Sequence, residues 1–157
     1  MIELLGPHAR HATGVDRSPE MLRLARSRLD GSNAAHHQLL QGDVTDLPLP
    51  GSSADTVIIH QVLHYLPAPE QAIAEAARLL GEGGYLLVAD FAPHDHEELR
   101  TQDAHARLGF SDSQMESWFQ ASDVMMDRIE TLGGGALTVK LWLGKRASQP
   151  QLKAISA

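Results

Sequence analysis

Apolar and polar positions between residues 41 and 90 alternate in a way that predicts strands separated by a helix. Residues 56–59 form a near-continuous apolar run, which is typical of a strand buried on both faces. Residues 69–80 carry apolar side chains at helical spacing, and residues 85–89 form a second apolar run. Polar residues follow each predicted strand directly. This arrangement favours an open, mostly parallel α/β sheet with a ligand crevice at the carboxyl ends of its strands.

The chain before this stretch shows the same alternation. The pattern predicts a helix end at residues 1–5, a strand at 12–15 that ends at Asp16, a helix at 19–29 and a strand at 37–41. Ser18 is a favourable N-cap for the second helix, and Pro19 suits its first position. Gly6-Pro7 and Asp30-Gly31 are expected to end the two helices.

The pattern changes after Asp90. Residues 91–96 predict a loop, which leads into a polar helix that reaches His105. Ser111 and Gln114 form a capping-box signature at the start of a further helix. Two helices are therefore expected between the buried strands and the C-terminal part of the chain.

Two further strands are predicted at residues 124–130 and 137–143. The glycine-rich linker between them indicates an antiparallel hairpin, and Gly81 is expected to cap the helix at residues 69–80. The predicted fold is therefore a doubly wound α/β sheet, mostly parallel, that finishes in an antiparallel hairpin. Residues 1–143 are expected to form one domain, and residues 144–157 a polar tail.

Composition narrows the classes of function. The 157 residues suffice for one domain with a substantial core, and a formal net charge of −7 argues against nucleic-acid binding by this chain alone. The sequence contains no cysteine, which excludes a disulfide, a thiolate metal site and a cysteine nucleophile. No apolar run approaches a membrane span, and the first residues do not resemble a signal peptide. A cytoplasmic protein that does not engage a membrane is expected.

Several short motifs occur in a fixed order along the chain. They are Gly14-Val15-Asp16-Arg17-Ser18-Pro19-Glu20-Met21-Leu22, Gln41-Gly42-Asp43, Leu47-Pro48, and Ala76-Ala77-Arg78-Leu79-Leu80 with Gly83-Gly84. In this order they resemble the class I S-adenosylmethionine-dependent methyltransferases, and most closely the type 11 enzymes related to ubiquinone and menaquinone biosynthesis. The resemblance covers roughly residues 1–143. It implies a Rossmann-like sheet, S-adenosyl-L-methionine as cofactor and a small-molecule methyl acceptor.

The resemblance also implies a set of cofactor contacts. Asp16 ends the second strand of the family, where an acidic residue can accept both ribose hydroxyls, and Arg17 lies beside it. Asp43 would bind the adenine amino group, with Val44 beside the ring. Met21 would pack against the adenine. The alternatives are a capping or turn role for Asp16, an ordinary Gly-Asp turn for Asp43, and a core position for Met21.

Four polar or aromatic residues at the end of the next strand are candidates for chemistry. His60 and Gln61 end the fourth strand of the family, beside the expected position of the transferable methyl group. His60 could contact the cofactor, and His60 or His64 could act as a general base near neutral pH. Gln61 and Tyr65 are candidates for substrate binding. The alternative for His60 is a hydrogen-bonded histidine that shapes the crevice.

A second group of histidines raises the question of a metal site. His94, Asp95, His96 and His105 fall within a short stretch. Metal ligands must converge on one point, and a surface loop rich in His and Asp usually does not provide this. No metal is therefore predicted.

A narrower resemblance supports an alternative function. Residues 60–65, 90–95 and 108–110, together with His105, resemble the C-terminal half of bacterial regulators in which a winged-helix DNA-binding domain precedes a methyltransferase domain. The alternative is thus a regulatory module that senses the cofactor or another ligand. A nicotinamide-dependent oxidoreductase is disfavoured by the terminal hairpin and by the lack of a Tyr-x-x-x-Lys motif.

The family pattern also contains a first strand and a Gly-rich turn, which are expected before Met1 and do not occur in this sequence. The strand would lie between the strand that ends at Asp16 and the strand at residues 56–59. We therefore expect an N-terminally truncated chain with impaired activity. Neighbouring strands lie about 4.8 Å apart, so the missing strand would leave a gap of one strand width and deprive the two strands beside it of a partner, which weakens the sheet. Self-association is expected to follow, and a homodimer is one form of it.

Overall fold

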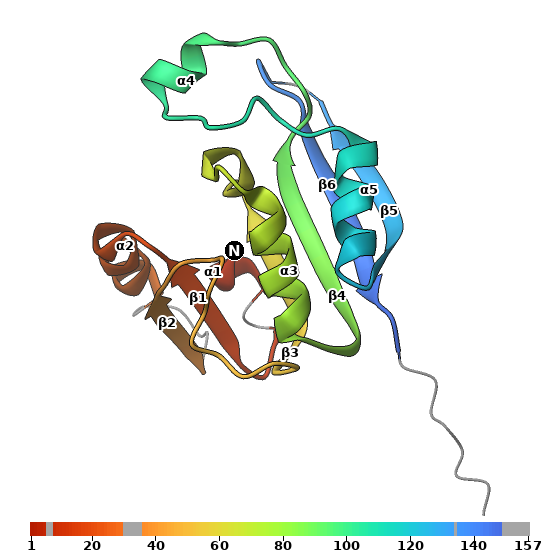
Figure 1. Cartoon of the computed structure of the whole chain (residues 1–157). Coiled ribbons are helices and arrows are strands. Elements are labelled where there is room, and N and C mark those ends of the chain that lie inside the picture. Colours follow the sequence, from red (N-terminus) through yellow and green to blue (C-terminus); the bar gives the residue numbers. More distant parts are fainter. Residues whose placement is uncertain (6–7, 30–35, 134, 149–157) are drawn as a thin grey trace, which may run out of the picture. The chain divides into compact units, whose positions relative to one another are not determined.

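Two separate sheets organise the protein, whose computed structural model describes residues 1–5, 8–29, 36–133 and 135–148. The chain divides into two compact units, Met1–Pro48 and Leu49–Ala157. Figure 1 shows the two-stranded sheet of the first unit in red to brown and the sheet of the second unit in yellow to blue.

The described residues of the first unit include two parallel strands and two α-helices. In chain order these are α1 (Ile2–Leu5), β1 (Ala12–Asp16), α2 (Pro19–Leu29) and β2 (His37–Gln41). The Ser18 hydroxyl accepts a hydrogen bond from the Met21 backbone N–H at 3.2 Å, so the predicted N-cap of α2 is confirmed. β1 and β2 run parallel and remain in register to Asp16, so both strands end at the same edge. The predicted helix ends at Gly6-Pro7 and Asp30-Gly31 lie outside the described residues.

The second unit is built on a four-stranded mixed sheet. Its strands, in spatial order, are β3 (Ala54–His60), β4 (Leu80–Phe91), β6 (Val139–Arg146) and β5 (Val124–Leu132). β3 and β4 are parallel, whereas β4 with β6 and β6 with β5 are antiparallel. The predicted α/β sheet with an antiparallel C-terminal hairpin is therefore confirmed. Among the strands that the structure describes, none joins β1 to β3.

Two helices pack on the four-stranded sheet, as Figure 1 shows. The helices of this unit are the short 3-10 helix η2 (Leu63–Tyr65), α3 (Pro69–Leu79), α4 (Glu98–Gln102) and α5 (Asp112–Ala121). The Ser111 hydroxyl accepts from the Gln114 backbone N–H at 3.2 Å, which confirms the predicted start of α5. Gly144 of β6 lets α5 approach closely, since a Cβ there would lie 2.6 Å from Phe119. Among the described residues, no helix combines the length and apolarity that crossing a membrane requires.

Two predicted helix ends in the second unit are wrong. Gly81 does not cap α3, because Leu80 is already extended and pairs with Ala54, so β4 begins where the helix ends. The polar helix does not reach His105, because α4 ends at Gln102 and the chain then turns the His105 side chain into the protein interior. β6 continues to Arg146, so its last three residues come from the predicted tail.

The 92–109 segment leaves the end of β4 and returns to it. The Phe110 backbone N–H donates to the Phe91 carbonyl oxygen at 2.9 Å, and the His94 N–H donates to the Leu108 carbonyl oxygen at 3.1 Å. Gly109 makes this closure possible, since its φ is +82° and a Cβ there would overlap the Ala92 carbonyl. In Figure 1 this segment, with α4, lies beyond the C-terminal end of β4.

Candidate functional site

In the first unit, two acidic residues lie at the ends of adjacent strands. Asp16 ends β1, and Asp43 comes two residues after the end of β2. The two strand ends are joined by the backbone, because the Gly42 N–H donates to the Asp16 carbonyl oxygen at 3.2 Å. The Gln41 side-chain amide donates to the Arg17 carbonyl oxygen at 3.1 Å and joins the two turns. Parallel pairing therefore brings the predicted cofactor residues Asp16, Arg17 and Asp43 to one edge.

The Asp43 carboxylate is held in its charged form by its own turn. Its Oδ1 accepts hydrogen bonds from the Thr45 N–H at 3.0 Å and from the Thr45 hydroxyl at 2.7 Å. These bonds lower the pKa of Asp43 below its ordinary value of 3.8, and the Arg17 guanidinium adds to this effect. Arg17 Nε lies 3.9 Å from Oδ2. At neutral pH the edge therefore presents a carboxylate that can accept a hydrogen bond.

Asp16 is one of the residues that line a hollow of about 260 Å³ within the first unit. Its Oδ1 accepts from the Ser18 N–H at 2.8 Å, and Oδ2 has no donor among the described residues. Met21 also lines the hollow and is 52% exposed, so it is accessible to a ligand instead of being sealed in the core. Val44 is half-buried and, like Asp43, lies outside this hollow. A free carboxylate oxygen beside an exposed methionine fits the ribose and ring of a nucleoside.

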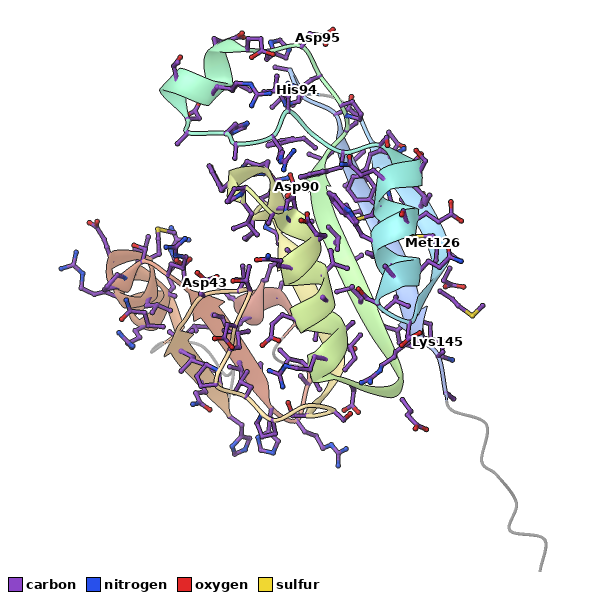
Figure 2. The ribbon with its side chains drawn as sticks, viewed as in Figure 1. Asp43, Asp90, His94, Asp95, Met126 and Lys145 are labelled. Atoms are coloured by element: carbon purple, nitrogen blue, oxygen red, sulfur yellow. The ribbon has the colours of Figure 1, made fainter. Side chains whose placement is uncertain are left out.

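The second unit contains a buried pair of titratable groups. Asp90 Oδ1 lies 2.7 Å from Nδ1 of His64, and the two side chains are 0% and 2% exposed. Asp90 also accepts from the Leu63 N–H at 3.0 Å and from the Phe91 N–H at 2.8 Å. The carboxylate therefore fixes both the His64 ring and the start of η2 at the end of β4. In Figure 2, Asp90 is labelled at this end of the strand.

The other predicted residues of this region are spread over different environments. His60 ends β3 and is exposed, and among the described residues it makes no ring contact. Gln61 follows with a φ of 55°, a backbone conformation that non-glycine residues seldom adopt, and its N–H donates to the Ala89 carbonyl oxygen at 2.8 Å. Tyr65 is 49% exposed, and its ring centroid lies 4.0 Å from that of His64. The structure thus brings His64 and Tyr65 together and leaves His60 apart.

Two further histidines join this cluster. The His105 ring is 7% exposed and lies 4.4 Å from the His64 ring, between centroids. The His94 ring lies 6.4 Å from that of His105. Burial lowers the pKa of both His94 and His105 below the ordinary value of 6.5, and the nearby His96 and His64 rings respectively lower it further. Both rings are therefore neutral at pH 7.

The sequence pattern indicated no chemical role for Asp90, and it offered His94 and His105 as candidate metal ligands and as part of the resemblance to the bacterial regulators. For Asp90 a signal existed, because it directly follows the buried strand predicted at residues 85–89. Its partner His64 could not be identified from spacing, since the two are 26 residues apart. Within the part of the chain that the structure describes, no three His, Cys, Asp or Glu side chains are placed to hold a metal ion.

The sequence is similar to several known proteins. A sequence model described as a methyltransferase domain matches residues 1–88. The carboxy-S-adenosyl-L-methionine synthase of Dichelobacter nodosus is 34% identical over 97 residues, and the demethylmenaquinone methyltransferase of Listeria welshimeri is 34% identical over 90 residues. These alignments cover 60% and 57% of this chain but 40% and 38% of the relatives. The chain thus spans about two fifths of the length of the curated relatives that it matches.

The fold is shared with solved structures. A Bacillus halodurans protein, described as a candidate methyltransferase, superposes with a TM-score of 0.82 at 14% identity. The match covers 93% of this chain and 87% of that chain. Similarity at this level of identity concerns the fold alone, and it confirms the predicted Rossmann-like architecture.

Proposed function

Since this chain belongs to the class I S-adenosylmethionine-dependent methyltransferase family, we propose that it takes part in methyl transfer to a small-molecule acceptor. Family membership implies S-adenosyl-L-methionine as the cofactor. The structural observation that carries the proposal is the edge of the first unit, where Asp16 and Asp43 lie at the ends of adjacent strands. When bound, the cofactor supplies a methyl group that is already activated on a sulfonium sulfur.

Three residues of the first unit are proposed to hold the nucleoside. The open Oδ2 of Asp16 would accept hydrogen bonds from the ribose hydroxyls. Met21 would cover one face of the adenine, because it is exposed at the same hollow. Asp43 would accept a hydrogen bond from the adenine amino group, since its lowered pKa keeps it ionised.

His64 is proposed to act on the acceptor. An acceptor hydroxyl that gains a methyl group must lose its proton, and a neutral imidazole can take it. Nδ1 of His64 faces Asp90, so Nε2 is the nitrogen that remains for the acceptor. Asp90 would stabilise the imidazolium that forms and hold the ring in place, which makes Asp90 a positioning residue.

Binding of S-adenosyl-L-methionine to the chain, measured by isothermal titration calorimetry, tests the cofactor assignment. Asp16→Ala is expected to weaken binding by about 1–3 kcal/mol, the scale of lost hydrogen bonds to a charged group. Glu20→Ala is the matched control, because Glu20 is a carboxylate in the same unit whose side chain is 81% exposed. Unchanged affinity in a folded Asp16→Ala variant would remove Asp16 from the site. Failure of the wild-type chain to bind would contradict the proposal.

A second reaction class is supported by the similarity to carboxy-S-adenosyl-L-methionine synthase at 34% identity. In that alternative, the same carboxylate edge binds the cofactor, and the cofactor itself is modified. Mass spectrometry of the reaction mixture separates the two, since methyl transfer yields S-adenosyl-L-homocysteine and the synthase reaction yields a carboxylated cofactor. Binding without any turnover would instead favour a ligand-sensing module.

A further inference from the structure

The His105 ring is enclosed by other rings in the second unit. We use the name ring cage for the side chains of His64, Tyr65, Phe91 and His94. The His105 ring stacks on Phe91 at 5.8 Å with an interplanar angle of 19°, and it meets Tyr65 edge-on at 5.5 Å and 86°. Its centroid is 4.4 Å from His64. One flat ring thus fills a space whose walls are themselves flat rings.

The ring cage is assembled from separate parts of the chain. His64 and Tyr65 come from η2, and Phe91 ends β4. His94 and His105 come from the 92–109 segment, and Figure 2 labels His94 there, beyond Asp90. The backbone of this segment is fixed to η2, because the Arg107 N–H donates to the His64 carbonyl oxygen at 3.0 Å. The His105 side chain could therefore leave the cage while the backbone around it stays in place.

Hydrogen bonding in and around the ring cage is incomplete when His105 occupies it. Two nitrogens, His105 Nδ1 and His94 Nε2, are buried without a hydrogen-bond partner, and no other described side chain contains such an atom. Nδ1 of His94 accepts from the His96 N–H at 3.3 Å, so the neutral ring carries its proton on Nε2. A buried donor without an acceptor indicates that the present occupant lacks an oxygen that the cage could bind.

We propose that the ring cage is the binding site for a flat, uncharged aromatic ring that carries a hydroxyl group, and that the His105 ring occupies this site when the ligand is absent. The ring walls select a flat ligand, because stacking and edge-on contacts need a π-system. The hydroxyl oxygen would accept from His94 Nε2. This inference rests on the proposed function, because it names the class of the methyl acceptor.

The charge of the ligand follows from the surrounding groups. The titratable groups that act on His94 are His96, Asp95, Glu98 and His64. Those that act on His105 are His64, Asp103, His94 and Asp90. Burial nevertheless lowers the pKa of both rings, so the cage disfavours a proton and, for the same reason, a cationic ligand. His64 is paired with the Asp90 carboxylate, and a wall of this kind is suited to accept a phenolic proton.

The test uses the full chain with His105→Ala, which should leave a hole of the shape of a ring. Phenol and cyclohexanol are the probes, because both carry one hydroxyl on a six-membered ring and only phenol is flat. Binding is followed by the NMR resonances of His64 and Phe91. We expect phenol to bind the variant at least tenfold more tightly than cyclohexanol, and more tightly than it binds the wild type. His96→Ala, which removes a half-exposed imidazole from the same segment, should give no such gain.

Equal binding of the two probes, or no binding at millimolar concentration, would overturn the inference. If His105→Ala does not fold, the comparison is made in the wild type. There, saturating phenol must shift the His105 ring resonances more than cyclohexanol does, and equal shifts would overturn the inference. S-adenosyl-L-methionine is titrated in parallel, so that a chain that binds the cofactor but not phenol refutes the acceptor class and leaves the proposed function standing.

Discussion

Asp90 Oδ1 lies 2.7 Å from Nδ1 of His64, and both residues are almost completely buried. The same carboxylate also accepts two backbone N–H groups, from Leu63 and Phe91. One buried side chain therefore determines the orientation of a candidate base and the path of the chain on either side of it. If this carboxylate is removed, all three of its partners lose the acceptor that they share.

Asp90→Asn should lower the free energy of unfolding by about 1–3 kcal/mol, because the amide replaces an acceptor oxygen by a donor that faces other donors. Urea denaturation of the wild type and the variant measures the change. Asp95→Asn serves as the control, since Asp95 is exposed on the loop that follows β4. An Asp90→Asn protein as stable as the wild type would show that the carboxylate is not needed.

Acidification should destabilise the second unit through His105. Its pKa in the folded state is lowered from 6.5, so the unfolded chain binds the proton more readily. The stabilising contribution is complete above pH 6.5 and falls as the pH drops from there towards the lowered pKa. Urea midpoints at pH 7.5 and 5.5 should differ more for the wild type than for His105→Phe. Equal differences would contradict the assignment of this effect to His105.

Thr45→Val should raise the pKa of Asp43 towards its ordinary value. The substitution removes the hydroxyl that donates to Asp43 Oδ1 at 2.7 Å and leaves the backbone N–H of residue 45 in place. The pKa should therefore rise only in part, which a carbon-13 NMR titration of the Asp43 carboxyl group can measure. Thr56→Val, in the other unit, is expected to have no effect on this titration. A Thr45→Val pKa equal to that of the wild type would mean that the hydroxyl bond contributes nothing.

Gly109→Ala should open the 92–109 segment. A Cβ at this position would overlap the Ala92 carbonyl, and a φ of +82° is strained for alanine, so a loss of more than about 1 kcal/mol is expected. Hydrogen exchange at the His94 and Phe110 amides should accelerate. Gly133→Ala is the matched control, because a Cβ there meets no atom within 4 Å. Equal exchange in both variants would show that the close approach at Gly109 does not hold the segment.

The sequence predicted those parts of the fold that depend on neighbouring residues. The caps at Ser18 and Ser111 follow from side chains that bond the backbone three residues away, and both are present. The predicted cap at Gly81 failed because pairing with a distant strand decided the outcome. Leu80 is completely buried and pairs with Ala54, and this long-range contact overrides the local preference of glycine for a helix end.

The same distinction applies to the candidate sites. The convergence of Asp16 and Asp43 could be predicted, since parallel strands place their ends at one edge. The pairing of His64 with Asp90 depends on how η2 folds back over the end of β4, which no local pattern specifies. The inward turn of His105 was missed for a related reason, because the polar pattern around it resembles an exposed helix.

The division of the chain into Met1–Pro48 and Leu49–Ala157 has a spectroscopic consequence. Every phenylalanine, tyrosine and tryptophan of the sequence lies at or after Tyr65. Intrinsic fluorescence and near-ultraviolet circular dichroism therefore report on the second unit alone, and Trp142, buried and bonded to Asp112 at 2.8 Å, should dominate the change on unfolding. The unit that contains Asp16 and Asp43 is silent to these methods. Its unfolding must be followed through methyl or amide NMR signals, and a single fluorescence transition would not show that the whole chain unfolds at once.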